Sequence, residues 1–186
     1  LFSRCRDVRV EGVTIRDPAR WSCYFKECDG VLARGLTINA HSNSNNDGID
    51  IESRNVLVED CDIDTGDDAI VLKSDNPNYC VENVEVRSCR VASNCNHFKL
   101  GTASHGSFRH IRFHDCTTRL CSRPTLKRGQ TAEDHLAWIR SEWPDCPSGL
   151  SAMSGIAVQN VDGGRLEDVS FENIVIEGAR TPIAVR

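Results

Sequence analysis

A short alternation of apolar and polar residues returns six times along the chain. Each copy breaks at a two-residue bend and then resumes, and an alternation of period two is typical of a β-strand. The copies begin at Val8, Val31, Val56, Val84, Ile111 and Val169. The first five starts lie 23 to 28 residues apart and the last step spans 58 residues, so the chain carries an internal repeat.

A second set of strand-like segments follows these copies, at residues 48–53, 69–74, 97–102, 155–160 and 182–186. Two or three strands in every 20–28 residues are typical of a solenoid, and almost no segment has the period of a helix. We therefore expect an all-β fold, a single-stranded parallel β-helix (solenoid) of about six coils. It would occupy residues 1–186 as one domain, with side chains stacked in columns about 4.8 Å apart.

The 58-residue step contains a long loop insertion at residues 119–154. Residues 131–140 form its one helix-like stretch, and Thr131 is in place to cap that helix. A long loop on a rigid solenoid either contacts the substrate or packs as a flap over one face. Cys121 and Cys146 bracket the insertion and are the best candidates for a disulfide.

Composition narrows the class of protein. With 22 basic and 27 acidic residues the net charge is −5, which argues against a general nucleic-acid binder. No apolar run reaches the roughly 18 residues of a membrane helix, and the spacing of the ten cysteines includes no zinc-type pair. We expect no metal site, no membrane partner and a monomer. Because the chain begins and ends within a repeat, we expect it to be the central coils of a longer protein, truncated at both ends.

Three cysteines fall in one repeat position, at Cys61, Cys89 and Cys116. Stacked small apolar residues at a β-helix corner are usually buried, so we expect these three to be buried free thiols.

Alignment of the second strands by their apolar positions predicts two inward columns. The first is Ile49, Ile70, Phe98 and Ile156, and the second is Ile51, Leu72, Leu100 and Val158.

This register fixes the residues that precede the columns. Asp47 lies over Asp68, Asp68 lies over Asn96, and Asp67 precedes Asp68 on the same coil. Three carboxylates should therefore converge on two neighbouring rungs, about 5 Å apart. Such groups repel one another, so we expect the pKa of at least one to rise.

Converging carboxylates have three interpretations. They can act as general acid and general base in glycoside hydrolysis, or they can bind Ca²⁺, which prefers oxygen ligands. Asn-Asp-Gly and Gly-Asp-Asp can also be plain turn sequences. The presence of both, in register and one coil apart, favours a functional site.

The motifs Asn45–Asp50 (Asn-Asn-Asp-Gly-Ile-Asp) and Thr65–Ile70 (Thr-Gly-Asp-Asp-Ala-Ile) resemble those of glycoside hydrolase family 28. That family comprises polygalacturonases and related pectin hydrolases built on a right-handed parallel β-helix, and the resemblance covers nearly all the chain outside the insertion. It implies that Asp67 is the general acid, that Asp68 and Asp47 position and activate water, and that hydrolysis inverts the anomeric carbon without a cofactor.

The chain departs from the family pattern at two places. The Gly-His-Gly motif should fall at Cys95–His97, which puts Asn96 at the histidine position and His97 one residue late. The Arg-Ile-Lys motif that grips the galacturonate carboxylate should fall at Ala157–Gln159, where neither cation is present. Because Ala and Gln cannot replace a bidentate guanidinium, the sequence favours a neutral or differently charged sugar.

Two lysines have two interpretations: they compensate for the missing cations, or they have a purely structural role. Lys99 falls one rung before Ala157, and Lys73 falls in the column of Gln159. They either hold an anionic sugar or pair with Asp50 and Glu52 in their own columns. The set expected to contact substrate is Asn45, Lys73, Asn96, His97, Lys99 and Gln159.

The sequence therefore predicts a glycosidase that acts on a pectin-like or related polysaccharide. A Ca²⁺-dependent polysaccharide lyase or epimerase is one alternative, and a non-catalytic carbohydrate-binding β-helix is the other. The expected partner is a polysaccharide or oligosaccharide, and the expected location is secreted or periplasmic.

Overall fold

The computed structural model describes residues 1–124, 130–142 and 150–186. These residues form strands and one helix: β1 (Phe2–Ser3), β2 (Arg6–Glu11), β3 (Thr14–Arg16), β4 (Cys23–Arg34), β5 (Thr37–Ala40), β6 (Ile49–Glu59), β7 (Asp62–Thr65), β8 (Ile70–Ser74), β9 (Cys80–Arg87), β10 (Arg90–Ser93), β11 (Asn96–Ser104), β12 (Ser107–His114), β13 (Thr117–Arg119), α1 (Ala132–Glu142), β14 (Ala152–Asn160), β15 (Leu166–Glu172) and β16 (Ala179–Val185).

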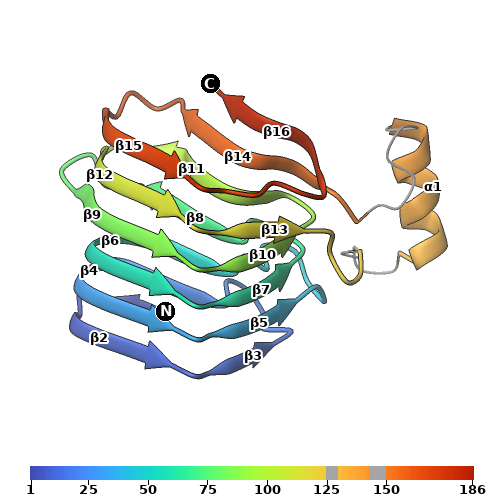
Figure 1. Ribbon diagram of the computed structural model, residues 1–186, viewed down its shortest axis with the longest axis horizontal. Helices are drawn as coiled ribbons and strands as arrows, with labels where there is room; N and C mark the ends of the chain where they lie inside the picture. Colours follow the sequence, from blue (N-terminus) through green and yellow to red (C-terminus); the bar gives the residue numbers. More distant parts are fainter. Residues whose placement is uncertain (125–129, 143–149) are drawn as a thin grey trace.

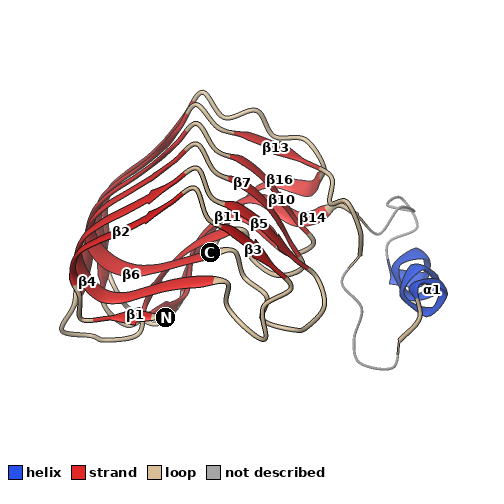
Figure 2. Ribbon diagram, turned by 90° about the horizontal axis from the view of Figure 1, so that it is seen from below, coloured by secondary structure: helices blue, strands red, loops and turns tan. Residues whose placement is uncertain are grey.

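The strands stack in parallel from coil to coil (Figure 1). One sheet runs in the order β15-β12-β9-β6-β8-β11-β14-β16, and the other runs β13-β10-β7-β5-β3. The first sheet covers two faces, because β6 pairs with β8 through its beginning and with β9 through its end. Figure 2 shows the coils nested on one another. The expected parallel β-solenoid of about six turns is thereby confirmed.

The predicted inward columns are present. Ile49 pairs with Ile70, Ile70 with Phe98, and Phe98 with Ile156, and the second column follows the same register. These side chains fill the core between the sheets, where Phe98 meets the ring of Phe113 edge-on at a centroid distance of 5.4 Å. Alternation of period two therefore predicted both the strands and their register.

A left-handed residue marks the same corner in successive coils. Gly30, Asn55, Asn83 and His110 each precede an aligned valine or isoleucine and have φ between 54° and 78°. Asparagine tolerates this conformation better than most residues. The side-chain amide of Asn83 also donates to Asn55 Oδ1 at 3.0 Å, so the corner is joined from coil to coil.

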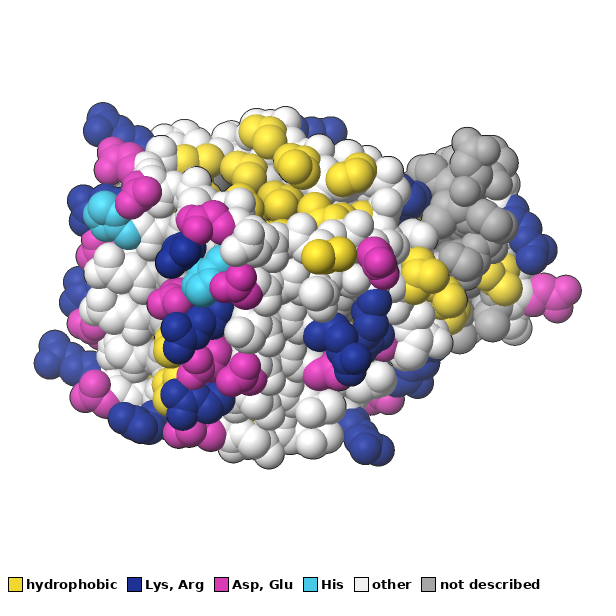
Figure 3. Space-filling view, in the orientation of Figure 1, with side chains coloured by type: hydrophobic (Ala, Val, Ile, Leu, Met, Phe, Trp, Pro, Cys, Tyr) yellow, Lys and Arg dark blue, Asp and Glu magenta, His cyan; other side chains and the backbone are white. Residues whose placement is uncertain are grey.

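Opposite charges alternate up the outside of the stack (Figure 3). Glu59 accepts Arg34 on one side and Arg87 on the other, the latter at 2.6 Å. Glu59 is buried while both arginines are partly exposed, and the two pairs favour the observed register.

The cysteine column lies as predicted. Cys61, Cys89 and Cys116 are buried free thiols, and the amide of Cys89 donates to Cys116 Sγ at 3.4 Å. All three belong to the hydrophobic core of the solenoid.

The connection between β13 and β14 carries α1, which stands beside the stack of coils (Figure 1). The predicted cap is present, since the amide of Asp134 donates to Thr131 Oγ1 at 3.1 Å and the Thr131 hydroxyl donates to Asp134 at 2.6 Å. Cys146, and with it the expected disulfide to Cys121, lies outside the described residues. Among the helices described, none has the length and apolar character that a membrane crossing requires.

Candidate active site

A cavity of about 540 Å³ opens on the sheet face that carries β4, β6, β8 and β11. Its lining combines acidic, basic and aromatic side chains: Leu1, Trp21, Tyr24, Lys26, Asn45, Asp47, Asp67, Asp68, Lys73, Asp75, Lys99, Thr102 and Ala103. All three carboxylates that the sequence singled out lie in this lining.

Backbone hydrogen bonds bring these carboxylates together. The amide of Gly48 donates to Asp68 O at 2.9 Å, and the amide of Ala69 donates to Asn96 O at 2.9 Å. In a parallel ladder these bonds set Asp47 beside Asp68 and Asp68 beside Asn96, as the sequence predicted. Gly48 is required here, because a Cβ at this position would lie 2.3 Å from Ala69 O.

Asp67 is held in a fixed turn. Its carbonyl oxygen accepts the hydroxyl of Thr65 at 2.8 Å and the hydroxyl of Ser93 at 2.6 Å. Its carboxylate oxygen Oδ1 accepts the amide of Asp68 at 2.9 Å. These bonds fix the backbone and the side chain in one orientation, which a proton donor requires.

The pKa of Asp67 is raised above the ordinary aspartate value. Burial is the main cause, followed by the negative charges of Asp47 and Asp68. The expected rise of at least one carboxyl pKa is thereby confirmed. A carboxyl with a raised pKa keeps its proton to higher pH, so Asp67 is suited to act as a general acid.

Asp68 has the opposite environment. It is buried, its Oδ2 accepts the ammonium of Lys99 at 2.8 Å, and its Oδ1 accepts the side-chain amide of Asn96 at 2.6 Å. These two donors hold the carboxyl group of Asp68 in one orientation. Asp68 is therefore suited to act as a carboxylate that orients water.

Asp47 shares one lysine with Asp50. The ammonium of Lys73 lies 2.9 Å from Asp47 Oδ2 and also pairs with Asp50 Oδ1. The pKa of Asp50 is raised, first by burial and then by the charge of Asp47. Burial lowers the pKa of Lys73, but the charges of Asp50 and Asp47 outweigh it and raise that pKa. Lys73 thus partly neutralises a dense group of carboxylates.

The lysines have different partners from those expected of their columns. One of the two interpretations paired Lys73 with Glu52 and Lys99 with Asp50 in their columns. Lys73 pairs with Asp47 and Asp50, and Lys99 pairs with Asp68. A lysine side chain is longer than the spacing between strands, so its column does not determine its partner. Glu52 instead pairs with Lys26 at 3.2 Å.

Other residues expected at the site divide into two groups. Asn45 lines the cavity, and Asn96 is bound to Asp68. His97 is fully buried outside the lining, and burial lowers its pKa to about 4. Gln159 lies opposite Gly101 in β14 and is also outside the lining.

Aromatic residues at one end of the cavity complete the site. Trp21 is partly exposed and meets the ring of Tyr24 edge-on at 5.3 Å, with Lys73 Nζ 5.5 Å from its centroid. The hydroxyl of Tyr24 donates to Glu52 at 2.9 Å. A fixed, exposed indole provides a stacking surface for a sugar ring. Trp21 could be named from the sequence as a residue able to stack on a sugar ring, whereas its contact with Tyr24 of β4 could not.

The cavity is poorly suited to Ca²⁺. Ligand atoms of Asp67, Asp68 and Cys95 lie within 4.8 Å of one another. Calcium takes six to eight oxygen ligands, whereas this group offers a thiol, and Lys99 and Asn96 already occupy both oxygens of Asp68. The arrangement therefore favours proton transfer over metal binding.

Known proteins resemble this chain in sequence. The model of the glycosyl hydrolases family 28 matches residues 1–93, which include Asp47, Asp67 and Asp68. A probable polygalacturonase of Arabidopsis thaliana is 37% identical over 86 residues, covering 45% of this chain and 19% of that protein. A polygalacturonase of Juniperus ashei is 28% identical over 180 residues, covering 91% of this chain and 35% of that protein.

A solved structure resembles the fold. The crystal structure of a hyperthermoactive exopolygalacturonase from Thermotoga maritima matches with a TM-score of 0.65 at 23% identity, over 98% of this chain and 37% of that chain. At this identity the likeness shows the fold alone. The chain spans well under half the length of the relatives it matches.

Proposed function

Because the chain belongs to the glycosyl hydrolases family 28, we propose that the protein hydrolyses glycosidic bonds in a pectin-type polysaccharide. One observation carries the proposal, namely the raised pKa of Asp67 beside the carboxyl groups of Asp47 and Asp68. A proton donor next to carboxylates that bind water is the arrangement that glycoside hydrolysis needs.

In the proposed mechanism Asp67 gives its proton to the oxygen of the leaving sugar. Asp68, with Asp47, accepts a proton from a water molecule that attacks the anomeric carbon from the opposite side. The bond to the leaving sugar breaks as the bond to water forms, so the product has the inverted configuration. Asp68 then releases its proton to solvent and Asp67 recovers one from it. General acid catalysis of this kind contributes about 10²–10⁴-fold to the rate.

We also propose that the sugar held in the cavity is uncharged. The three lysines in the described lining already pair with carboxylates: Lys26 with Glu52, Lys73 with Asp47, and Lys99 with Asp68. A galacturonate carboxylate would have to displace one of these partners or remain near the negative charge of Asp67. A neutral unit stacked on Trp21 avoids both costs.

Reducing-sugar release from a panel of polysaccharides tests these proposals. The decisive pair is polygalacturonate and highly methyl-esterified pectin, because esterification removes the charge and leaves the linkage unchanged. We expect faster release from the ester, resistance to EDTA, and loss of release in Asp67→Asn. Faster release from polygalacturonate would contradict the proposal that the bound sugar is uncharged, and would leave the proposal of hydrolysis standing. EDTA-sensitive cleavage with rising ultraviolet absorbance would indicate a lyase and contradict the hydrolase.

Two statements stay predictions: that the protein is secreted, and that the insertion contacts the polysaccharide. Protease protection of the α1 region by bound oligosaccharide would support the contact, and its absence would favour a packing flap.

A further inference from the structure

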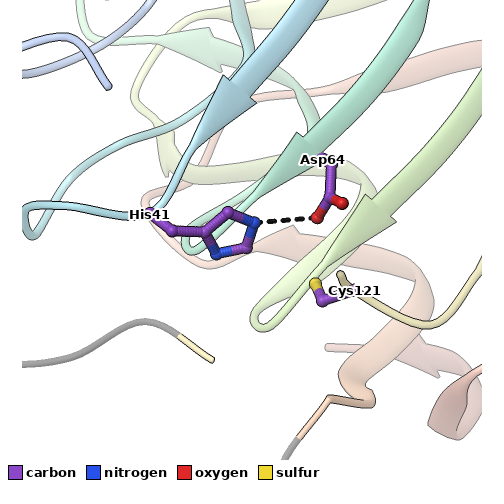
Figure 4. A group of neighbouring side chains, drawn as sticks. All are labelled: His41, Asp64 and Cys121. Atoms are coloured by element: carbon purple, nitrogen blue, oxygen red, sulfur yellow. Dashed lines mark hydrogen bonds and ion pairs between the residues drawn. The ribbon is translucent and has the colours of Figure 1, made fainter. Parts of the chain in front are cut away.

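A second group of functional side chains lies buried beyond the cavity. His41 follows β5, Asp64 belongs to β7 and Cys121 follows β13, so the three come from separate coils of one sheet. All are buried, and one ligand atom from each lies within 4.8 Å of the other two. Figure 4 shows the three side chains pointing toward one another, with the thiol beside the bond between His41 and Asp64.

We propose that His41, Asp64 and Cys121 bind one divalent transition-metal ion of the zinc class. Imidazole nitrogen, carboxylate oxygen and thiolate sulfur are the donors that zinc takes in proteins, with bonds of about 2.0–2.3 Å. Three protein ligands and one water complete a four-coordinate site.

The contacts of Asp64 place its Oδ1 toward the proposed ion. Its Oδ2 accepts the amide of Ser122 at 3.0 Å and the guanidinium of Arg119 at 3.3 Å, while its Oδ1 faces His41 Nε2 at 2.8 Å. The pKa of Asp64 is lowered: burial raises it, but hydrogen bonds from His41 and Ser122 outweigh that effect. An ion would lie between Nε2 and Oδ1, with the imidazole in the tautomer that carries its proton on Nδ1, and Arg119 and Ser122 would keep Oδ2.

His41 is also oriented from behind. Its backbone amide donates to Asp17 Oδ1 at 3.0 Å, and Arg123 holds the same carboxylate at 2.7 Å. These bonds fix the backbone at His41, from which its side chain reaches Asp64.

Binding exchanges a proton for the metal. Burial, followed by the charge of Asp64, raises the pKa of Cys121, so the free site holds a thiol. The ion forms a bond to sulfur as the thiol proton leaves for solvent, with no change of oxidation state.

Such an ion would join the start of the insertion to the active-site turn. In the metal-free site the Cys121 thiol donates to Thr65 O at 3.5 Å, and the ion would replace this bond with a link through Asp64 of the same strand, β7. The hydroxyl of Thr65 in that strand donates to Asp67 O at 2.8 Å. The metal would thus stabilise the segment that carries the general acid while taking no part in the chemistry.

Cobalt titration of the full-length protein tests the site, after EDTA treatment and in a non-thiol reductant that keeps Cys121 reduced. We expect one equivalent of Co²⁺ to bind, with a thiolate charge-transfer band, and Zn²⁺ to displace it and raise the melting temperature. Cys121→Ser should lose the band and bind at least tenfold more weakly, and His41→Gln should also bind at least tenfold more weakly.

Cys80→Ser, which changes a partly buried thiol outside the group, is the matched control and should behave as the parent. The melting temperature of each metal-free variant shows that it folds. Absence of the band in the parent protein, or an equal band in Cys121→Ser, would overturn the proposal.

Discussion

The ammonium of Lys99 lies 2.8 Å from Asp68 Oδ2, and its charge also lowers the pKa of the neighbouring Asp67. Lys99 therefore holds the carboxylate of Asp68 and limits how strongly Asp67 retains its proton. The two effects are separable, because one acts on the rate and the other on the pH dependence.

Replacement of Lys99 by Met should move the alkaline limb of the kcat/KM profile to higher pH. Removal of the positive charge raises the pKa of Asp67 further, so the acid stays protonated over a wider range. The rate at the optimum should fall about tenfold or more, because Asp68 loses a bond that orients it. A pH–rate profile of Lys99→Met measures the shift of the alkaline limb and the fall in rate. Arg109→Met, which removes an exposed cation paired with Glu82, is the control. An alkaline limb that stays in place would contradict the coupling.

Replacement of Asp67 by Asn should inactivate the enzyme and stabilise the fold. The folded-state pKa of Asp67 is raised, so its contribution to stability is present at low pH and is lost as pH rises through that pKa. The unfolding free energy of the variant should therefore be about 1 kcal/mol higher than that of the parent at pH 7 and little different below pH 4. Its kcat should fall about 10²–10⁴-fold. Urea unfolding at both pH values measures the gain. Asp168→Asn, an exposed position, is the control, and a variant less stable at pH 7 would count against the account.

His97 should make the fold sensitive to mild acid. Burial lowers its folded-state pKa from 6.5 to about 4, so protonation of the unfolded chain removes stability as pH falls between these values. The loss approaches about 3 kcal/mol by pH 4. His97→Leu should lack this part of the pH dependence and keep kcat/KM within about threefold, because His97 is outside the cavity lining. An unchanged pH dependence of unfolding, or a large loss of rate, would refute this role.

Phe98 should contribute strongly to stability. It is fully buried between Ile70 and Ile156 and contacts the ring of Phe113. Phe98→Ala should cost about 3–5 kcal/mol of unfolding free energy. Met153→Ala, at a side chain that is 49% exposed, should cost less than about 1 kcal/mol in the same denaturation experiment. Equal costs would show that the central column is not the core.

The register of the coils could be predicted from sequence, and with it the meeting of Asp47 and Asp68. Strand alternation has a period of two, so a slip of one residue would turn the column of Ile49 and Ile70 outward. Because that column was unambiguous, the residues just before it were placed correctly.

Side-chain partners could not be predicted in the same way. Lys73 and Lys99 each reach a carboxylate on the neighbouring rung that is displaced along the strand, so their column does not select one partner. The group of His41, Asp64 and Cys121 escaped notice because its members lie at strand ends, separated by 23 and 57 positions, where no alternation pattern aligns them.

The anomeric configuration of the first sugar released tests the central claim most directly. Proton NMR of early product, before mutarotation, should show the configuration opposite to that of the bond cleaved, and Asp67→Asn should release none. Retained configuration, or an unsaturated product, would contradict single-displacement hydrolysis by Asp67, Asp68 and Asp47.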